Sequence, residues 1–113
     1  MVKLEGLIEE ITDWIIINID RPLSIEDVAA HSGYSKWHLQ RVFTKMTGIS
    51  MGMYIRDIKL SMAAQDLVSS HDKIMDISFR YGFESQQSFT RTFAKKYNSP
   101  PHKYRVLNTE RHI

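Results

Sequence analysis

The amino-acid sequence predicts an all-α fold in which two helix-turn-helix subdomains are joined by a long linker helix. Apolar residues recur at three- and four-residue spacing along most of the chain, as they do on one face of an amphipathic helix. No stretch of useful length alternates between apolar and polar residues as a half-buried strand does. The chain also repeats one pattern after about 50 residues, which is typical of two copies of one supersecondary unit.

The repeat consists of two matched series. The first series pairs Ile25 with Ile74, Asp27 with Asp76, Val28 with Ile77, Gly33 with Gly82 and Tyr34 with Phe83. With one extra residue in the second turn, the match continues with Leu39 and Phe89, Arg41 and Arg91, Phe43 and Phe93, Lys45 and Lys95, and Tyr54 and Tyr104. Each copy predicts two short amphipathic helices around a glycine turn, which is the helix-turn-helix pattern.

The first two helices have clear ends in the sequence. The apolar face of the first helix consists of Leu4, Leu7, Ile8, Ile11, Trp14, Ile15 and Ile19. Pro22 is expected to end it, because proline disfavours the helical conformation in the residue before it. Ser24 and Asp27 form a capping-box pattern at the start of a second helix, which is expected to run to about His31.

The third helix is expected over about residues 36–47. Gly33 can adopt a positive φ in the turn before it, and Ser35 is a favourable N-cap. The buried positions expected on this helix are Leu39 and Phe43, with Met46 as a third candidate.

A long linker helix and three shorter helices follow. Gly48 is expected to end the third helix, and Ser50 to cap a linker helix with no proline from Met51 to Ser69, which spans about 28 Å. Residues 70–73 break it, and Ser85 caps the sixth helix. The fifth helix carries Ile74, Ile77 and either Phe79 or Tyr81, and the sixth is expected to bury Phe89 and Phe93. The sixth helix ends at residues 98–101, and a short seventh helix holds Tyr104.

Composition places the chain among ordinary globular proteins. Its 113 residues are 42% hydrophobic and 25% charged, which suits one compact domain or two subdomains too small to be stable far apart. The absence of cysteine excludes disulfide bonds, a thiol nucleophile and a Cys-type zinc site. The longest apolar run, Trp14–Ile17, is far shorter than a membrane span, and the N-terminus lacks the features of a secretory signal. A cytoplasmic location is therefore expected.

Charge is distributed unevenly along the chain. The overall net charge is only +2. Residues 1–20 contain one basic and five acidic residues, a net charge of −4, whereas the remainder contains 14 basic and 8 acidic residues, a net charge of +6. This asymmetry fits a nucleic-acid-binding body with an acidic outer helix, and it also fits ordinary surface variation.

The second helix of each copy carries the candidate DNA contacts. In a helix-turn-helix motif this helix enters the major groove, and its exposed N-terminal residues meet the base edges. The candidate DNA-binding residues are Lys36, Trp37, His38, Gln40, Arg41, Thr44 and Lys45 in the first copy, and Gln86, Gln87, Ser88, Thr90, Arg91, Lys95 and Lys96 in the second. Arginine pairs with guanine and glutamine with adenine, whereas lysines further along meet phosphates.

An ordinary solvated helix face is the alternative for these residues. Two observations favour DNA contact over it. Arg41 and Arg91 occupy equivalent positions in the repeat. Each of the two helices also carries three lysines or arginines and no acidic residue. The sequence therefore predicts a single DNA-binding domain over residues 1–113, with a first subdomain over 4–49, a linker helix over 50–70 and a second subdomain over 71–108.

Signals for catalysis are weak. Residues 48–52 match the G-x-S-x-G pattern of hydrolases, but that pattern requires a preceding strand, so Ser50 is expected to be a helix cap. The five histidines lack the i,i+4 spacing of a zinc site, and no glycine-rich phosphate loop occurs. No enzyme activity, metal site or cofactor is expected.

Three segments of the chain form a recognisable set: SGYSKWHLQRVF from Ser32, RYGFESQQSFTRTF from Arg80 and PPHKYR from Pro100. They closely resemble the AraC/XylS family of transcription activators, and most closely its MarA–SoxS–Rob subgroup. The resemblance covers about residues 8–105. It implies a monomer that places two recognition helices in successive major-groove segments of a degenerate site. It also implies base contacts from Trp37, Gln40, Arg41, Gln86, Gln87 and Arg91, and activation of drug-efflux, porin-control and stress genes through contact with RNA polymerase.

The chain departs from the family pattern at Asn98, where glycine is usual, and at Ser78, where alanine is common. Asparagine also tolerates the left-handed conformation. Most family members carry a further effector domain, so a chain of 113 residues is expected to be controlled by its abundance. If the linker helix holds the recognition helices closer than about 34 Å, the DNA must bend to receive both. A helical module that acts mainly on RNA polymerase, with weak DNA affinity, is the alternative function.

Overall fold

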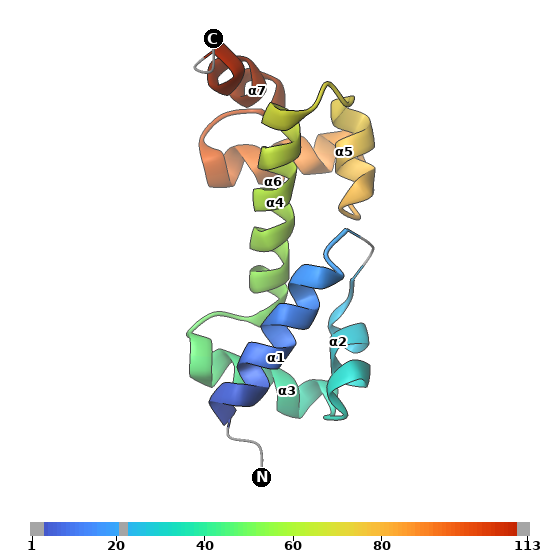
Figure 1. The fold of residues 1–113 in the computed structure, drawn as a ribbon, viewed down its shortest axis with the longest axis vertical. Helices are drawn as coiled ribbons and strands as arrows, with labels where there is room; N and C mark the ends of the chain where they lie inside the picture. Colours follow the sequence, from blue (N-terminus) through green and yellow to red (C-terminus); the bar gives the residue numbers. More distant parts are fainter. Residues whose placement is uncertain (1–3, 21–22, 111–113) are drawn as a thin grey trace. The chain divides into compact units, whose positions relative to one another are not determined.

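The computed structural model describes residues 4–20 and 23–110 and contains seven helices over this range. The first helix ends at Ile17, earlier than the predicted end at Pro22, which itself lies outside the described residues. The helices are α1 (Leu4–Ile17), α2 (Ile25–Ser32), α3 (Lys36–Thr47), α4 (Met51–Ser69), α5 (Ile74–Arg80), α6 (Gln86–Tyr97) and α7 (Pro101–Glu110) (Figure 1). Every regular element of the described residues is a helix, which confirms the predicted all-α class.

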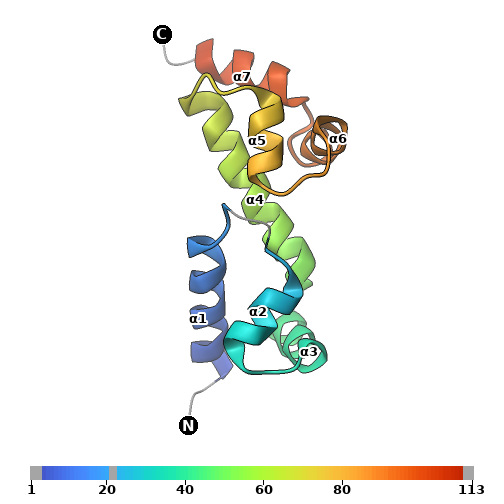
Figure 2. The same ribbon diagram turned by 90° about the vertical axis from the view of Figure 1, so that its right-hand side faces the viewer.

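The chain forms two compact units, residues 1–58 and residues 59–113. In the first unit, α1, α2 and α3 contact one another (Figures 1 and 2). The buried apolar side chains of this unit are Ile11, Ile15, Ile19, Leu23, Val28, Ala29, Leu39, Phe43, Met51 and Ile55. On α3 the predicted Leu39 and Phe43 are buried, whereas on α1 Ile11 and Ile15 are buried and the rest of the described apolar face is half-buried.

In the second unit, α5, α6 and the second half of α4 surround one apolar cluster. The cluster consists of Leu60, Ala63, Ala64, Leu67, Ile77, Tyr81, Phe89 and Phe93. Tyr97 and Tyr104 pack against its edge, and their ring centroids lie 4.6 and 5.3 Å from that of Phe93. The contact of Tyr104 with Phe93 repeats that of Tyr54 with Phe43 in the first unit, whereas Tyr97 adds a ring that the first unit lacks, since Thr47 stands at the equivalent position.

Two of the candidate core positions are exposed. Met46 is 37% exposed, so its predicted burial is wrong. It follows Phe43 by three residues, which turns its side chain to the margin of the buried face. On α5, Tyr81 is buried and Phe79 is 51% exposed. Phe79 follows the buried Ile77 by two residues and so lies on the opposite side of the helix.

The helix ends follow the predicted capping chemistry. Ser50 Oγ accepts a hydrogen bond from the backbone N–H of Met53 at 3.2 Å, so Ser50 is a helix cap as expected. α4 then continues for 19 residues without interruption. Asn98 ends α6 in the left-handed conformation, with φ of 57°, at a helix end where glycine is the usual residue and asparagine also occurs. None of the described helices has the length and apolar character needed to cross a membrane.

Candidate nucleic-acid interface

The start of α3 is fixed by capping bonds in the first helix-turn-helix motif. Ser24 and Asp27 form the predicted capping box, in which each backbone N–H donates to the other side chain at 3.0 and 3.2 Å. Gly33 has φ of 80° and ends α2, with its N–H donating to the carbonyl of Ala29. Ser35 Oγ accepts from the N–H of His38 and so caps α3. The direction in which α3 begins is therefore set by the hydrogen bonds of the Gly33 turn and the Ser35 cap.

One face of α3 presents Trp37, Arg41 and Lys45 to solvent. Leu39 and Phe43 are fully buried on the other face, and 3.6-residue periodicity places this triad opposite them. The Arg41 guanidinium lies 4.6 Å from the centroid of the Trp37 ring, over its face. Such stacking restricts a long flexible side chain to one direction. A shallow depression in this face is lined by Trp37, Gln40, Arg41, Thr44 and Lys45.

Two candidates of the first copy have partners within their own motif. Lys36 Nζ lies 2.5 Å from Glu26 Oε1 on α2, and this hydrogen bond lowers the pKa of Glu26. The ring of His38 stacks on Tyr34, with centroids 5.3 Å apart. The structure therefore brings five of the seven candidates of the first copy to one depression and turns Lys36 back toward α2.

The second motif repeats this geometry with different residues. Gly82 has φ of 83° in the turn, and the N–H of Phe83 donates to the carbonyl of Ser78 at 3.1 Å. Ser85 Oγ accepts from the N–H of Ser88 at 3.0 Å and so caps α6. The predicted N-caps of both recognition helices are confirmed.

One face of α6 presents Gln87, Arg91 and Lys95 to solvent. Phe89 and Phe93 are fully buried on the opposite face. Gln86 is exposed, whereas Ser88 and Thr90 are half-buried at the flanks of this face. The exposed face contains no acidic residue, as in α3. Amide, guanidinium and ammonium groups therefore line one side of the helix.

Lys96 lies on a different side of α6. Its Nζ is 3.4 Å from Ser61 Oγ on α4 and 5.4 Å from the centroid of the Tyr97 ring. The structure therefore separates Lys96 from its neighbour Lys95, although both belong to the predicted set.

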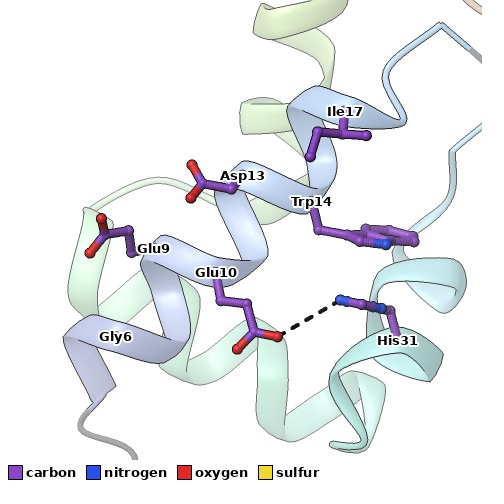
Figure 3. A pocket seen from close by; sticks show the side chains of 7 residues that line it. All are labelled: Gly6, Glu9, Glu10, Asp13, Trp14, Ile17 and His31. Atoms are coloured by element: carbon purple, nitrogen blue, oxygen red, sulfur yellow. Dashed lines mark ion pairs between the residues drawn. The ribbon is translucent and has the colours of Figure 1, made fainter.

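The sequence predicted an acidic first helix, but it did not predict two polar groups that the structure brings together. The first lies on α1, where Trp14 is half-buried and stacks on His31 at 4.4 Å between ring centroids (Figure 3). The surrounding groove is lined by Gly6, Glu9, Glu10, Asp13, Trp14, Ile17 and His31. The three acids beside an aromatic residue on one helix are the sequence signal for this groove.

The second group joins Asp66 to Arg80 and Tyr81 in the second unit. No spacing rule connects an acid on one helix with residues 14 and 15 positions later on another. Among the described residues, no group of three or more potential ligands is placed to hold a metal ion.

Comparison with known proteins places the sequence among helix-turn-helix regulators. Residues 28–106 match the helix-turn-helix domain family. The multiple antibiotic resistance protein MarA of Salmonella typhimurium is 54% identical over 101 residues, which cover 89% of this chain and 80% of MarA. The transcriptional activator AarP of Providencia stuartii is 44% identical over 104 residues, which cover 92% of this chain and 77% of AarP.

A solved structure gives the same result for the fold. It is a transcriptional regulator of Chromobacterium violaceum, described as a protein with an AraC-type DNA-binding domain, with a TM-score of 0.86 and 27% identity. The alignment covers 94% of this chain and 95% of that one. The arrangement of helices is therefore that of an AraC-type DNA-binding domain.

Proposed function

We propose, from the premise that this chain belongs to the AraC/XylS family of helix-turn-helix regulators, that it activates transcription as a monomer reading two neighbouring segments of one DNA site. The observation that carries the proposal is the equivalence of two exposed faces. Each recognition helix has an arginine at the same position of the repeat, a lysine one turn later and no acidic residue. An ordinary solvated helix face would not be expected to carry the same pattern of charged residues in both copies.

The proposed roles follow from the side-chain chemistry. Arg41 and Arg91 read guanine through two parallel hydrogen bonds, and Gln40, Gln86 and Gln87 read adenine. The exposed ring of Trp37 packs on thymine methyl groups and sugars while holding Arg41 above it. The remaining candidates on the exposed faces contact phosphates or the margins of the groove; they are His38, Thr44, Lys45, Ser88, Thr90 and Lys95. Lys36, which pairs with Glu26, and Lys96, which lies toward Ser61, are the candidates with the weakest DNA contact. Phosphate contacts position the protein without reading sequence.

The partner beyond DNA is RNA polymerase. The groove on α1 supports this role, because Glu9, Glu10 and Asp13 surround the half-buried Trp14 and the exposed Ile17 (Figure 3). These acids would repel a DNA phosphate backbone. A face that combines an aromatic ring with carboxylates suits a basic protein surface instead.

The regulated genes follow from the relatives. MarA is named for multiple antibiotic resistance, so the genes proposed for this chain serve drug efflux, porin control and stress responses in the cytoplasm of a bacterium. A module that acts on polymerase with weak DNA affinity is not favoured, because residues 28–106 match a helix-turn-helix domain and the relative AarP is named as a helix-turn-helix transcriptional activator.

The test is a titration of labelled duplexes at fixed physiological salt. A site enriched by selection from random DNA is compared with a scrambled duplex of the same length. The expected result is affinity for the enriched site at least about a thousandfold higher, with one protein per duplex. Equal and strongly salt-dependent affinity for both duplexes would leave only phosphate attraction and would reject sequence-specific reading.

A further inference from the structure

The carboxylate of Asp66 lies at the centre of a polar cluster in the second unit. Its Oδ2 accepts hydrogen bonds from Arg80 Nη1 at 2.8 Å and from Tyr81 Oη at 2.6 Å. Asp66 belongs to α4, whereas Arg80 is the last residue of α5 and Tyr81 is its C-cap. One carboxylate therefore ties α4 to the end of α5.

A second set of bonds holds the loop between these two helices. Arg80 Nη2 donates to Asp72 Oδ2 at 2.8 Å. Arg105, on α7, donates through Nη2 to the carbonyl of Asp72 at 2.6 Å and through Nε to the carbonyl of Leu67 at 2.8 Å. The loop is thus held by arginines from α5 and α7, and Arg80 bridges it to Asp66.

The protonation states suit these bonds at neutral pH. Burial raises the pKa of Tyr81, and the hydrogen bond to Asp66 raises it further, so the phenol stays protonated and donates. The hydrogen bond from Arg80 lowers the pKa of Asp72, so this carboxylate stays ionised and accepts.

The turn after Tyr81 leads directly to the recognition helix α6. Phe83 donates its N–H to the carbonyl of Ser78, and its ring meets that of Phe89 edge-on at 5.2 Å. Ser85, two residues later, caps α6. Because this turn is short, a change in the backbone orientation at Tyr81 would also move the first residues of α6.

We propose that Asp66 is a positioning residue for DNA reading by the second unit. By holding Arg80 and Tyr81, it fixes the turn and with it the places at which Gln86, Gln87 and Arg91 meet base edges. This inference rests on the proposed function, because it concerns the accuracy of the same recognition helix. Misplacement of such contacts by about an ångström is enough to weaken them strongly.

The test uses the intact protein and three duplexes: the enriched site, and the same site with either half scrambled. Arg41→Ala and Arg91→Ala first identify which half each unit reads, since each loses its effect when its own half is scrambled. Asp66→Asn should then weaken binding to the enriched site by about tenfold, which equals about 1.4 kcal/mol. It should follow the pattern of Arg91→Ala, with no loss on the duplex whose second-unit half is scrambled.

Two further variants separate positioning from general stability. Asp76→Asn is the matched control, because Asp76 is an exposed acid in the first turn of α5. It should leave all three affinities unchanged. Tyr81→Phe removes one hydrogen bond and keeps the buried ring. It should weaken binding to the same duplexes as Asp66→Asn, by a smaller factor. This variant tests the proposal even if Asp66→Asn fails to fold.

The outcomes are distinct. Equal losses on all three duplexes, or no loss by Asp66→Asn and Tyr81→Phe on the enriched site, would overturn the positioning role while leaving the proposed function intact. A wild-type protein that binds enriched and scrambled duplexes equally would instead overturn the proposed function itself, before any Asp66 variant is compared.

Discussion

The residue two positions before the turn glycine differs between the two units, although the helix-turn-helix pattern is the same. In the first unit this residue is His31, whose ring stacks on Trp14 with planes 11° apart and whose Nε2 lies 4.0 Å from Glu10 (Figure 3). In the second unit the equivalent residue is Arg80, which bridges Asp66 and Asp72. We call these contacts the clamps of the two turns. In the first unit the clamp is the stacking of His31 on Trp14, and in the second it is the permanently charged guanidinium of Arg80 with its two carboxylates.

The difference shows which parts of the repeat are constrained. The positions of the buried phenylalanines and of Arg41 and Arg91 are the same in both copies, because packing and the proposed base contacts both depend on them. The clamp needs only to hold the turn, so chemically unrelated residues, His31 and Arg80, can occupy this position in the two units. The comparison predicts that equivalent substitutions in the two units change stability or DNA affinity by different amounts wherever the surrounding residues differ.

The largest effect is expected from truncation of the core. Phe43 and Phe93 are equivalent and fully buried, and Phe43 meets the ring of Tyr54, whereas Phe93 meets three aromatic rings. Each change to alanine should lower the free energy of unfolding of its own unit by about 3–5 kcal/mol, with Phe93→Ala nearer the upper value. Urea unfolding followed by amide hydrogen exchange measures the loss in each unit. A greater loss for Phe43→Ala would contradict the comparison.

A smaller effect is expected from the two arginines on DNA. Arg41→Ala and Arg91→Ala should each weaken binding to the enriched site by about 1–3 kcal/mol and affect scrambled DNA much less. The stacking of Arg41 on Trp37 is an added feature of the first unit, whose equivalent position in the second is Gln87. Titration of the enriched and scrambled duplexes with both variants shows whether each arginine contacts bases or only phosphate. Equal losses on enriched and scrambled DNA would show that an arginine contacts only phosphate.

The sequence predicted the fold and the exposed recognition faces because both follow from local periodicity and capping. Ser35, Ser50 and Ser85 cap their helices as expected, and Asn98 takes the left-handed conformation. The sequence did not predict that Lys36 pairs with Glu26 or that Asp66 pairs with Arg80. Such pairs depend on how helices pack within a unit, and the hydrophobic pattern does not specify that.

A still smaller effect separates two adjacent lysines. Lys95 lies on the exposed face with Arg91, whereas Lys96 lies toward Ser61 and the ring of Tyr97. Lys95→Ala should weaken binding to every duplex similarly and reduce the slope of affinity against salt by about one. Lys96→Ala is the matched control and should change the slope less. The reverse order in a salt titration of both variants would show that the face of α6 assigned to DNA is the wrong one.

The smallest effect is expected from acid, because the ion pairs concerned are at the surface. Hydrogen bonds from Lys36 and Arg80 lower the pKa values of Glu26 and Asp72 respectively. A carboxylate whose pKa is lowered by folding binds fewer protons in the folded than in the unfolded state. The stability that it contributes is therefore present above its ordinary pKa and is lost as the pH falls through the folded value.

Acid unfolding between about pH 6 and pH 2 should accordingly be less steep in Glu26→Gln for the first unit and in Asp72→Asn for the second. Both tryptophans, Trp14 and Trp37, belong to the first unit, so their fluorescence follows that unit, and amide hydrogen exchange follows the second. Each variant serves as the control for the other. A change of acid sensitivity in the opposite unit would mean that the two clamps are not independent, and the separate treatment of the units would have to be abandoned.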